Sequence, residues 1–248
     1  MANIAEVTRA ERATRSAPRN SAVTDNLGPF AWAFALSGMF FVLYPVLRPF
    51  SSEAGLEGGR AFGSSSWVAA HTLGILGFIL LAIGCLGFYL RLRGAATERR
   101  ALHALVLSWI GVGLTLPYYG AEVFGLHAVG QHAVAQDNPG LVKPLAHGIR
   151  WEAGIWFIIV GLVLLAAGVI VLATAIWRSG LVHRWAGVPL ATGLALYIPQ
   201  FTGPQAVRIA HALLMLAGCW WLAWLLATAA PQQQEATNAG TVGTHQRL

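Results

Sequence analysis

The feature that most constrains this chain is an apolar run at residues 67–90 that contains no Asp, Glu, Lys or Arg. As a helix rising about 1.5 Å per residue, it is long enough to cross a hydrocarbon core of about 30 Å. The run also carries small residues at helical spacing, which allow a neighbouring helix to approach closely: Gly74, Gly77, Gly84 and Gly87. The chain as a whole is 56% hydrophobic and 10% charged, against about 25% charged residues in soluble proteins. We therefore expect an integral membrane protein.

The chain contains further apolar segments that are expected to be membrane-spanning helices. We expect an all-α fold, a bundle of six transmembrane helices within residues 30–229, between disordered cytoplasmic tails at residues 1–29 and 230–248. The spans are expected at residues 30–47, 67–90, 101–126, 151–177, 185–200 and 206–229. Residues 127–150 are expected to form the longest internal loop. The first 29 residues have no apolar core like that of a secretory signal peptide.

The distribution of basic residues predicts the orientation. If both termini are cytoplasmic, eleven of the sixteen Lys and Arg residues lie on the cytoplasmic side, as the positive-inside rule requires. Arginine greatly outnumbers lysine, and Ala and Gly are abundant, which is typical of a GC-rich bacterial genome. We therefore expect a multi-pass protein of the bacterial inner membrane, N-in and C-in, with the lipid bilayer as its partner. The basic residues are scattered, so no nucleic-acid partner is expected. The sequence does not indicate an oligomeric state.

Polar side chains gather at one depth under this topology. Glu122 ends a segment that otherwise belongs in lipid, where an ionisable residue is costly and marks a function or a buried pair. Tyr118 and Glu122 are four residues apart and share a helix face. Every predicted helix places polar residues in the outer layer, and we expect a ligand-binding pocket there. Its candidate residues are His71, Tyr118, Tyr119, Glu122, Arg150, Tyr197, Arg208 and His211.

Several roles remain open for these residues. Glu122 has three possible roles. It binds a ligand or exchanges a proton, it extends its side chain to water at the membrane surface, or it forms an ion pair that only fixes helix packing. The candidate partners for that ion pair are Arg48, Arg150 and Arg208. His71 and His211 either bind a ligand or donate hydrogen bonds between helices. The tyrosines lie where an aromatic belt is expected.

Metal and cofactor signals are weak. The spacing of the histidines in residues 127–150 matches no standard zinc motif, so no metal and no cofactor is predicted. Six helices with histidines at two depths nevertheless resemble cytochrome b561-type proteins. That resemblance implies b-type haem electron transfer, with His71 and His211 as the outer ligand pair and His103 and His183 as the inner pair. The chain also resembles uncharacterised multi-pass bacterial membrane proteins, a likeness that transfers no function.

Three functions follow as hypotheses. The leading one is a protein that binds or transports a small or amphipathic ligand, as a transporter, a sensor or an accessory subunit. Residues 30–126 and 151–229 do not repeat each other, which weakens the transport hypothesis. The alternatives are haem electron transfer and an intramembrane enzyme that acts on a lipid or isoprenoid. In that enzyme Glu122 would be the general acid; the sequence alone does not decide whether the protein is an enzyme.

Overall fold

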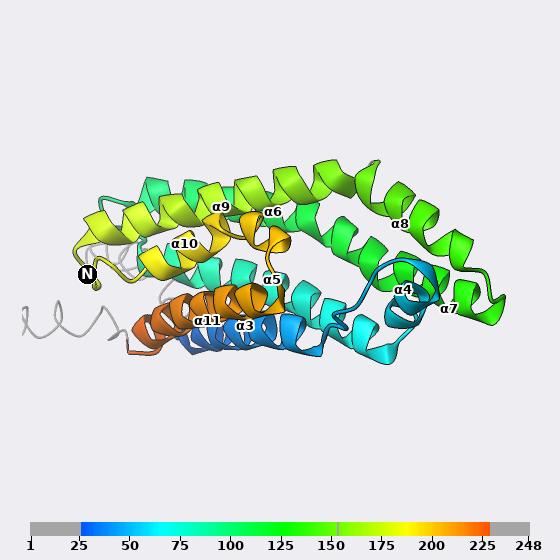
Figure 1. The fold of residues 1–248 in the computed structure, drawn as a ribbon. Helices are drawn as coiled ribbons and strands as arrows, with labels where there is room; N and C mark the ends of the chain where they lie inside the picture. Colours follow the sequence, from blue (N-terminus) through cyan, green and yellow to red (C-terminus); the bar gives the residue numbers. More distant parts are fainter. Residues whose placement is uncertain (1–25, 153, 229–248) are drawn as a thin grey trace, which may run out of the picture. The chain divides into compact units, whose positions relative to one another are not determined.

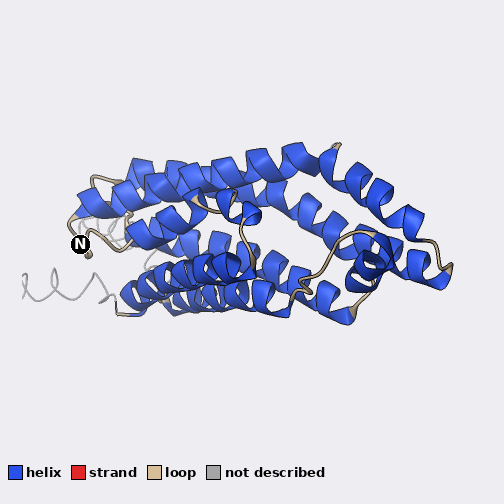
Figure 2. Cartoon of the chain, viewed as in Figure 1, coloured by secondary structure: helices blue, strands red, loops and turns tan. Residues whose placement is uncertain are grey.

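The computed structural model describes residues 26–152 and 154–228, and all of their regular secondary structure is helical (Figure 2). The predicted tails lie almost wholly outside these residues. The helices, labelled in Figure 1, are α3 (Gly28–Leu47), α4 (Gly55–Phe62), α5 (Ser65–Arg91), α6 (Glu98–Gly120), η1 (Ala121–Leu126), α7 (His127–Ala135), η2 (Pro139–Leu141), α8 (Val142–Trp151), α9 (Gly154–Ser179), α10 (Val188–Ala195), η3 (Pro199–Thr202) and α11 (Gln205–Ala227).

Five described helical runs are long and apolar enough to cross a membrane. They are α3, α5, the continuous run α6–η1–α7, α9 and α11. Their outward faces carry large apolar side chains such as Trp32, Trp156 and Val163, which lipid tolerates and water does not. The chain is therefore an all-α, multi-pass membrane protein, as predicted.

Small residues set the closest helix contacts. A Cβ atom added to Gly111 of α6 would lie 2.5 Å from the backbone nitrogen of Leu165 in α9, and one added to Gly161 of α9 would lie 2.5 Å from Oγ1 of Thr115. Close approach of this kind is how membrane helices gain packing energy, because lipid is as apolar as a leucine side chain. The glycines of α5 serve the same purpose, as predicted: Gly77 and Gly84 lie against phenylalanine rings of α3.

The predicted fifth span is short in the structure. Residues 185–200 contain only α10, which is eight residues long, and the 3-10 helix η3 begins at Pro199. Eight residues rise about 12 Å, less than half of the hydrocarbon thickness. Helix α10 packs between α9 and α11, with Gly187 against Ala173 and Gly218 against Leu190. Beyond the end of α10, the chain passes through η3 to the start of α11 (Figure 1).

Residues 127–150, expected to be a loop, are mostly helical. The run α6–η1–α7 is 38 residues long, or about 57 Å at 1.5 Å per residue, so it extends well past a membrane of ordinary thickness. Helices α4, α7 and α8 pack together at this end of the bundle (Figure 1), and we call them the cap. Phe62 and Trp67 are fully buried in the core of the cap. This buried aromatic core is what keeps the segment ordered and helical.

Candidate functional site

A buried ion pair lies where the cap meets the bundle. Nε and Nη2 of Arg150 donate to the two carboxylate oxygens of Glu122, over 2.6 and 2.9 Å. The Glu122 side chain is only 6% exposed and that of Arg150 is 16% exposed. Two parallel bonds between a guanidinium and a carboxylate give both strength and a fixed geometry. Glu122 is thus held by α8, through one of the partners that the sequence offered.

Glu53, in the segment between α3 and α4, extends this pair into a network. Its carboxylate accepts hydrogen bonds from both Arg48 and Arg150. Burial alone would raise the pKa of Glu53, but the two arginines lower it below its ordinary value. Burial would likewise lower the pKa of Arg150, yet Glu122 and Glu53 raise it. Both shifts favour the charged forms of Glu53 and Arg150.

The backbone around Glu122 is unusual. Residues 121–126 form the π-helix η1, which follows Pro117 in α6. The indole nitrogen of Trp67 donates to the carbonyl oxygen of Glu122 over 2.7 Å, and so ties α5 to the π-helix. Single π-turns inside long helices occur often at functional sites. Here the π-helix turns the Glu122 side chain toward Arg150.

His71 connects the network to the aromatic side chains deeper in the bundle. Its Nδ1 lies 2.8 Å from the carbonyl oxygen of Trp67, a contact that needs the ring proton on Nδ1. Nε2 then faces Oε2 of Glu122 and the hydroxyl of Tyr44, both at 3.5 Å. Below this point, the hydroxyls of Tyr119 and Tyr197 share a hydrogen bond of 2.9 Å. The polar groups thus continue from the ion-pair network into the bundle, through the imidazole of His71 and the tyrosine hydroxyls.

A cavity of about 440 Å³ adjoins this network, a size within the range of small-molecule sites. Its lining combines charged side chains, which are Glu53, Glu122 and three arginines, with an apolar wall on α9. The wall consists of Ile155, Ile158, Ile159 and Leu162. Side chains at and just before η3 complete the lining: Ile198, Phe201 and Thr202. The cavity exists because α10 ends early, so that no full helix fills the space between α9 and α11.

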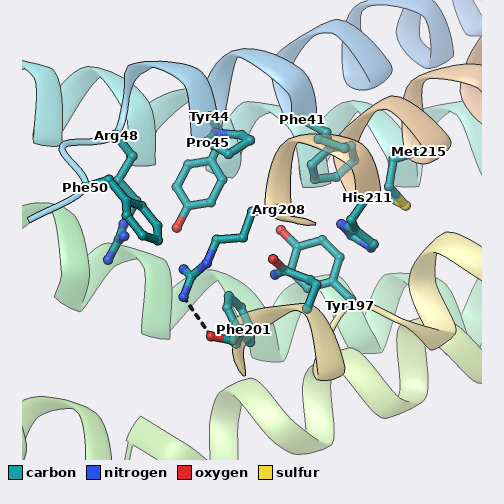
Figure 3. A pocket seen from close by; sticks show the side chains of 12 residues that line it. Phe41, Tyr44, Pro45, Arg48, Phe50, Tyr197, Phe201, Arg208, His211 and Met215 are labelled. Atoms are coloured by element: carbon teal, nitrogen blue, oxygen red, sulfur yellow. Dashed lines mark hydrogen bonds between the residues drawn. The ribbon is translucent and has the colours of Figure 1, made fainter. Parts of the chain in front are cut away.

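Arg208 of α11 lines both this cavity and a smaller one of about 20 Å³, whose lining residues Figure 3 shows. Its guanidinium donates to the carbonyl oxygens of Phe201 and Gly203, over 2.7 and 3.2 Å. No carboxylate among residues 26–152 and 154–228 pairs with it. Tyr44, Arg48 and Phe201 line both cavities together with Arg208.

The structure brings most of the predicted site residues together. Six line the larger cavity: His71, Tyr118, Tyr119, Glu122, Arg150 and Arg208. Tyr197 and His211 line the smaller cavity. Of the three partners proposed for Glu122, Arg150 is the one that bonds to it. That these residues bind a ligand stays a prediction.

Sequence reasoning missed two features of this site. Glu53 lies five residues after Arg48 in a polar connection, and only its pairing with two arginines shows its importance. The apolar wall on α9 looks in the sequence like any lipid-facing helix. The sequence does carry a signal for the early end of α10 beside the cavity. It is the run Tyr197–Ile198–Pro199, because a proline soon after an apolar segment indicates a helix that stops early.

The histidines predicted as haem ligands make other contacts within the protein. Nε2 of His211 lies 2.7 Å from the carbonyl oxygen of Gly193 and therefore carries a proton. Nε2 of His71 faces Glu122. Among the predicted inner ligands, the ring of His183 lies against Trp221. The haem hypothesis stays untested.

The fold and site define a multi-pass α-helical membrane protein with an ion-pair network and an adjoining cavity where the cap meets the bundle. Comparison with models of protein families, with curated proteins and with solved structures finds no match for this chain. The arguments for its function therefore depend on the site alone.

Proposed function

We propose that this protein binds a small amphipathic molecule in the 440 Å³ cavity, with the bilayer as the source of the ligand. The observation that carries the proposal is that charged side chains and an isoleucine-rich wall of α9 line the same cavity. An amphipathic molecule can place its polar end on the first and its chain on the second. Ile159 and Ile198 are also exposed at the surface of the bundle, so the apolar end of the cavity reaches the region that lipid occupies.

The proposal places the cavity in the outer half of a bacterial inner membrane. We propose six crossings, with α10 and η3 together as the short one. This is supported by the start of α3 and the end of α11, which lie at the same end of the bundle as the α5–α6 connection (Figure 1). The excess of arginine at that end favours a cytoplasmic position for it.

A labelling experiment tests this orientation. Cys85 and Cys219 are buried, so a cysteine introduced at an exposed position would be the only one accessible to a membrane-impermeant maleimide. Ser51, on the cap side, and Ala96, in the α5–α6 connection, are both exposed. In intact cells we expect Ser51→Cys to be labelled and Ala96→Cys to be protected. The reverse pattern would overturn the orientation.

A cavity-filling substitution tests ligand binding. In Ile155→Trp the indole occupies the space beside the apolar wall, whereas Val163→Trp on the same helix adds the same indole to an exposed position outside the cavity. Native mass spectrometry of protein released from detergent would report bound tetradecanol, a chain-bearing probe without charge. We expect adducts on the wild type and Val163→Trp and a loss of at least about tenfold on Ile155→Trp. Equal adducts on all three proteins would rule out this cavity as the site.

A further inference from the structure

The charges that line the cavity are not balanced. Three arginines (Arg48, Arg150 and Arg208) and two glutamates (Glu53 and Glu122) contribute to the lining. Glu122 is bonded to Arg150, and Glu53 bridges Arg150 and Arg48. The carboxylates are thus used within the network, and one positive charge remains without a counter-ion among the described residues.

That charge belongs to Arg208. Its hydrogen bonds employ Nε and Nη2, and both acceptors are neutral carbonyl oxygens of the segment that contains η3. Those bonds hold the guanidinium in place beside the cavity without neutralising it (Figure 3). A charge kept in a partly buried position normally pairs with another charge, because removing it from water is costly.

Arg48 provides an independent second observation. Its side chain is 10% exposed, and its buried Nε has no hydrogen-bond partner among the described residues. A buried N–H group without a partner costs free energy, and such groups are rare in native proteins. Arg48 and Arg208 line both cavities together. An unused donor and an uncompensated cation therefore lie on the same boundary.

We infer that the ligand is an amphipathic anion. Its carboxylate or phosphate head binds at Arg208 and Arg48, and its apolar chain lies along the isoleucine wall of α9. This inference rests on the proposed function and adds the charge of the head group. The anion supplies the counter-charge for Arg208, and Arg48 adds a second positive charge to the lining. Because Arg150 is committed to both glutamates, it positions the network and does not contact the head group.

The test compares probes with the same chain and different head groups, by native mass spectrometry. The probes are myristate, tetradecyl phosphate, tetradecanol and tetradecyltrimethylammonium. We expect at least one of the two anions to bind about tenfold or more tightly than the alcohol, a difference typical of hydrogen bonds to charged groups, and the cation to bind most weakly. Acetate and inorganic phosphate, which have no chain, should not displace the bound anion at the same concentration. If they displace it, the site takes a water-soluble anion and the chain-bearing class is wrong.

Substitutions then locate the head group. Arg208→Gln should lower the affinity for the preferred anion to that of tetradecanol and leave the affinity for tetradecanol unchanged, and Arg208→Lys should keep most of the preference. Arg184→Gln is the matched control, because Arg184 lies outside the cavity, against Trp177 and Trp185. Should Arg208→Gln fail to fold, the wild-type ranking of the probes still decides.

The outcomes separate this inference from the proposed function. If tetradecanol binds as tightly as both anions and Arg208→Gln changes nothing, the anionic head group is wrong while the cavity remains a ligand site. If no chain-bearing probe is sensitive to Ile155→Trp, the proposed function itself fails.

Discussion

Replacing Arg150 by methionine should destabilise the protein strongly. The substitution keeps an apolar side chain of similar length and removes the guanidinium that bonds to both oxygens of Glu122. Glu122, whose side chain is 6% exposed, then keeps Tyr118 and, at 3.5 Å, His71 as nearby polar partners, and neither replaces the two bonds from the guanidinium. Removing one partner of a buried ion pair costs about 3–5 kcal/mol. Since Glu53 would still have Arg48, we expect the lower part of that range, about 3 kcal/mol.

The double substitution Glu122→Gln/Arg150→Met tests whether the cost comes from the unpaired charge. With both charges gone, no buried carboxylate is left without a partner, and we expect a loss of about 1 kcal/mol or less, because replacing a whole buried pair is often nearly neutral. Equilibrium unfolding in mixed micelles with increasing SDS would supply the free energies. Arg184→Met, which removes an exposed arginine, serves as the control and should change stability by about 0.5 kcal/mol at most.

Two results would refute this reasoning. A loss below about 1 kcal/mol for Arg150→Met would mean that the pair behaves like one on a protein surface. Strictly additive losses in the double variant would mean that Glu122 and Arg150 do not interact.

Three further predictions concern other parts of the molecule. Because the arginines lower the pKa of Glu53 in the folded state, its contribution to stability is present at neutral pH and is lost as the pH falls below about 4.5. The free energy of unfolding of the wild type should therefore fall more steeply in acid than that of Glu53→Gln. Parallel curves for the two proteins would contradict this. Gly111→Val should destabilise the protein by about 1–3 kcal/mol, because the added side chain meets the backbone of α9, while Gly113→Val, with no atom within 4 Å of an added Cβ, should be nearly neutral in the same unfolding assay. Protein purified from haem-replete cells should show no Soret band in oxidised or dithionite-reduced spectra, since Nε2 of His211 carries a proton toward the carbonyl oxygen of Gly193. A band that shifts on reduction would support the haem hypothesis.

The sequence was sufficient to predict the membrane class, because apolar length and the absence of charge are local properties. It also singled out Glu122 and Arg150, because a charge at membrane depth is rare enough to be informative. Which arginine pairs with Glu122 depends on how α8 folds back onto the π-helix. That contact spans 28 residues and has no local signal.

The other differences between the sequence predictions and the structure also have physical causes. Residues 127–150 are polar enough to be mistaken for a loop, but their apolar positions are buried against Phe62 and Trp67, which only tertiary packing shows. The shortness of α10 follows from the turns that end it near Pro199. The six crossings and the orientation stay predictions that labelling can test.

Photolabelling would test the central claim most directly. A myristate analogue with a diazirine at the end of its chain would be irradiated with the protein in lipid nanodiscs, and the labelled peptides identified by mass spectrometry. We predict that label concentrates on the wall residues Ile155, Ile158, Ile159 and Leu162 of α9, and that excess myristate and the Ile155→Trp substitution both suppress it. Label spread evenly over lipid-facing positions such as Trp32 and Trp156, unaffected by competitor or substitution, would contradict it.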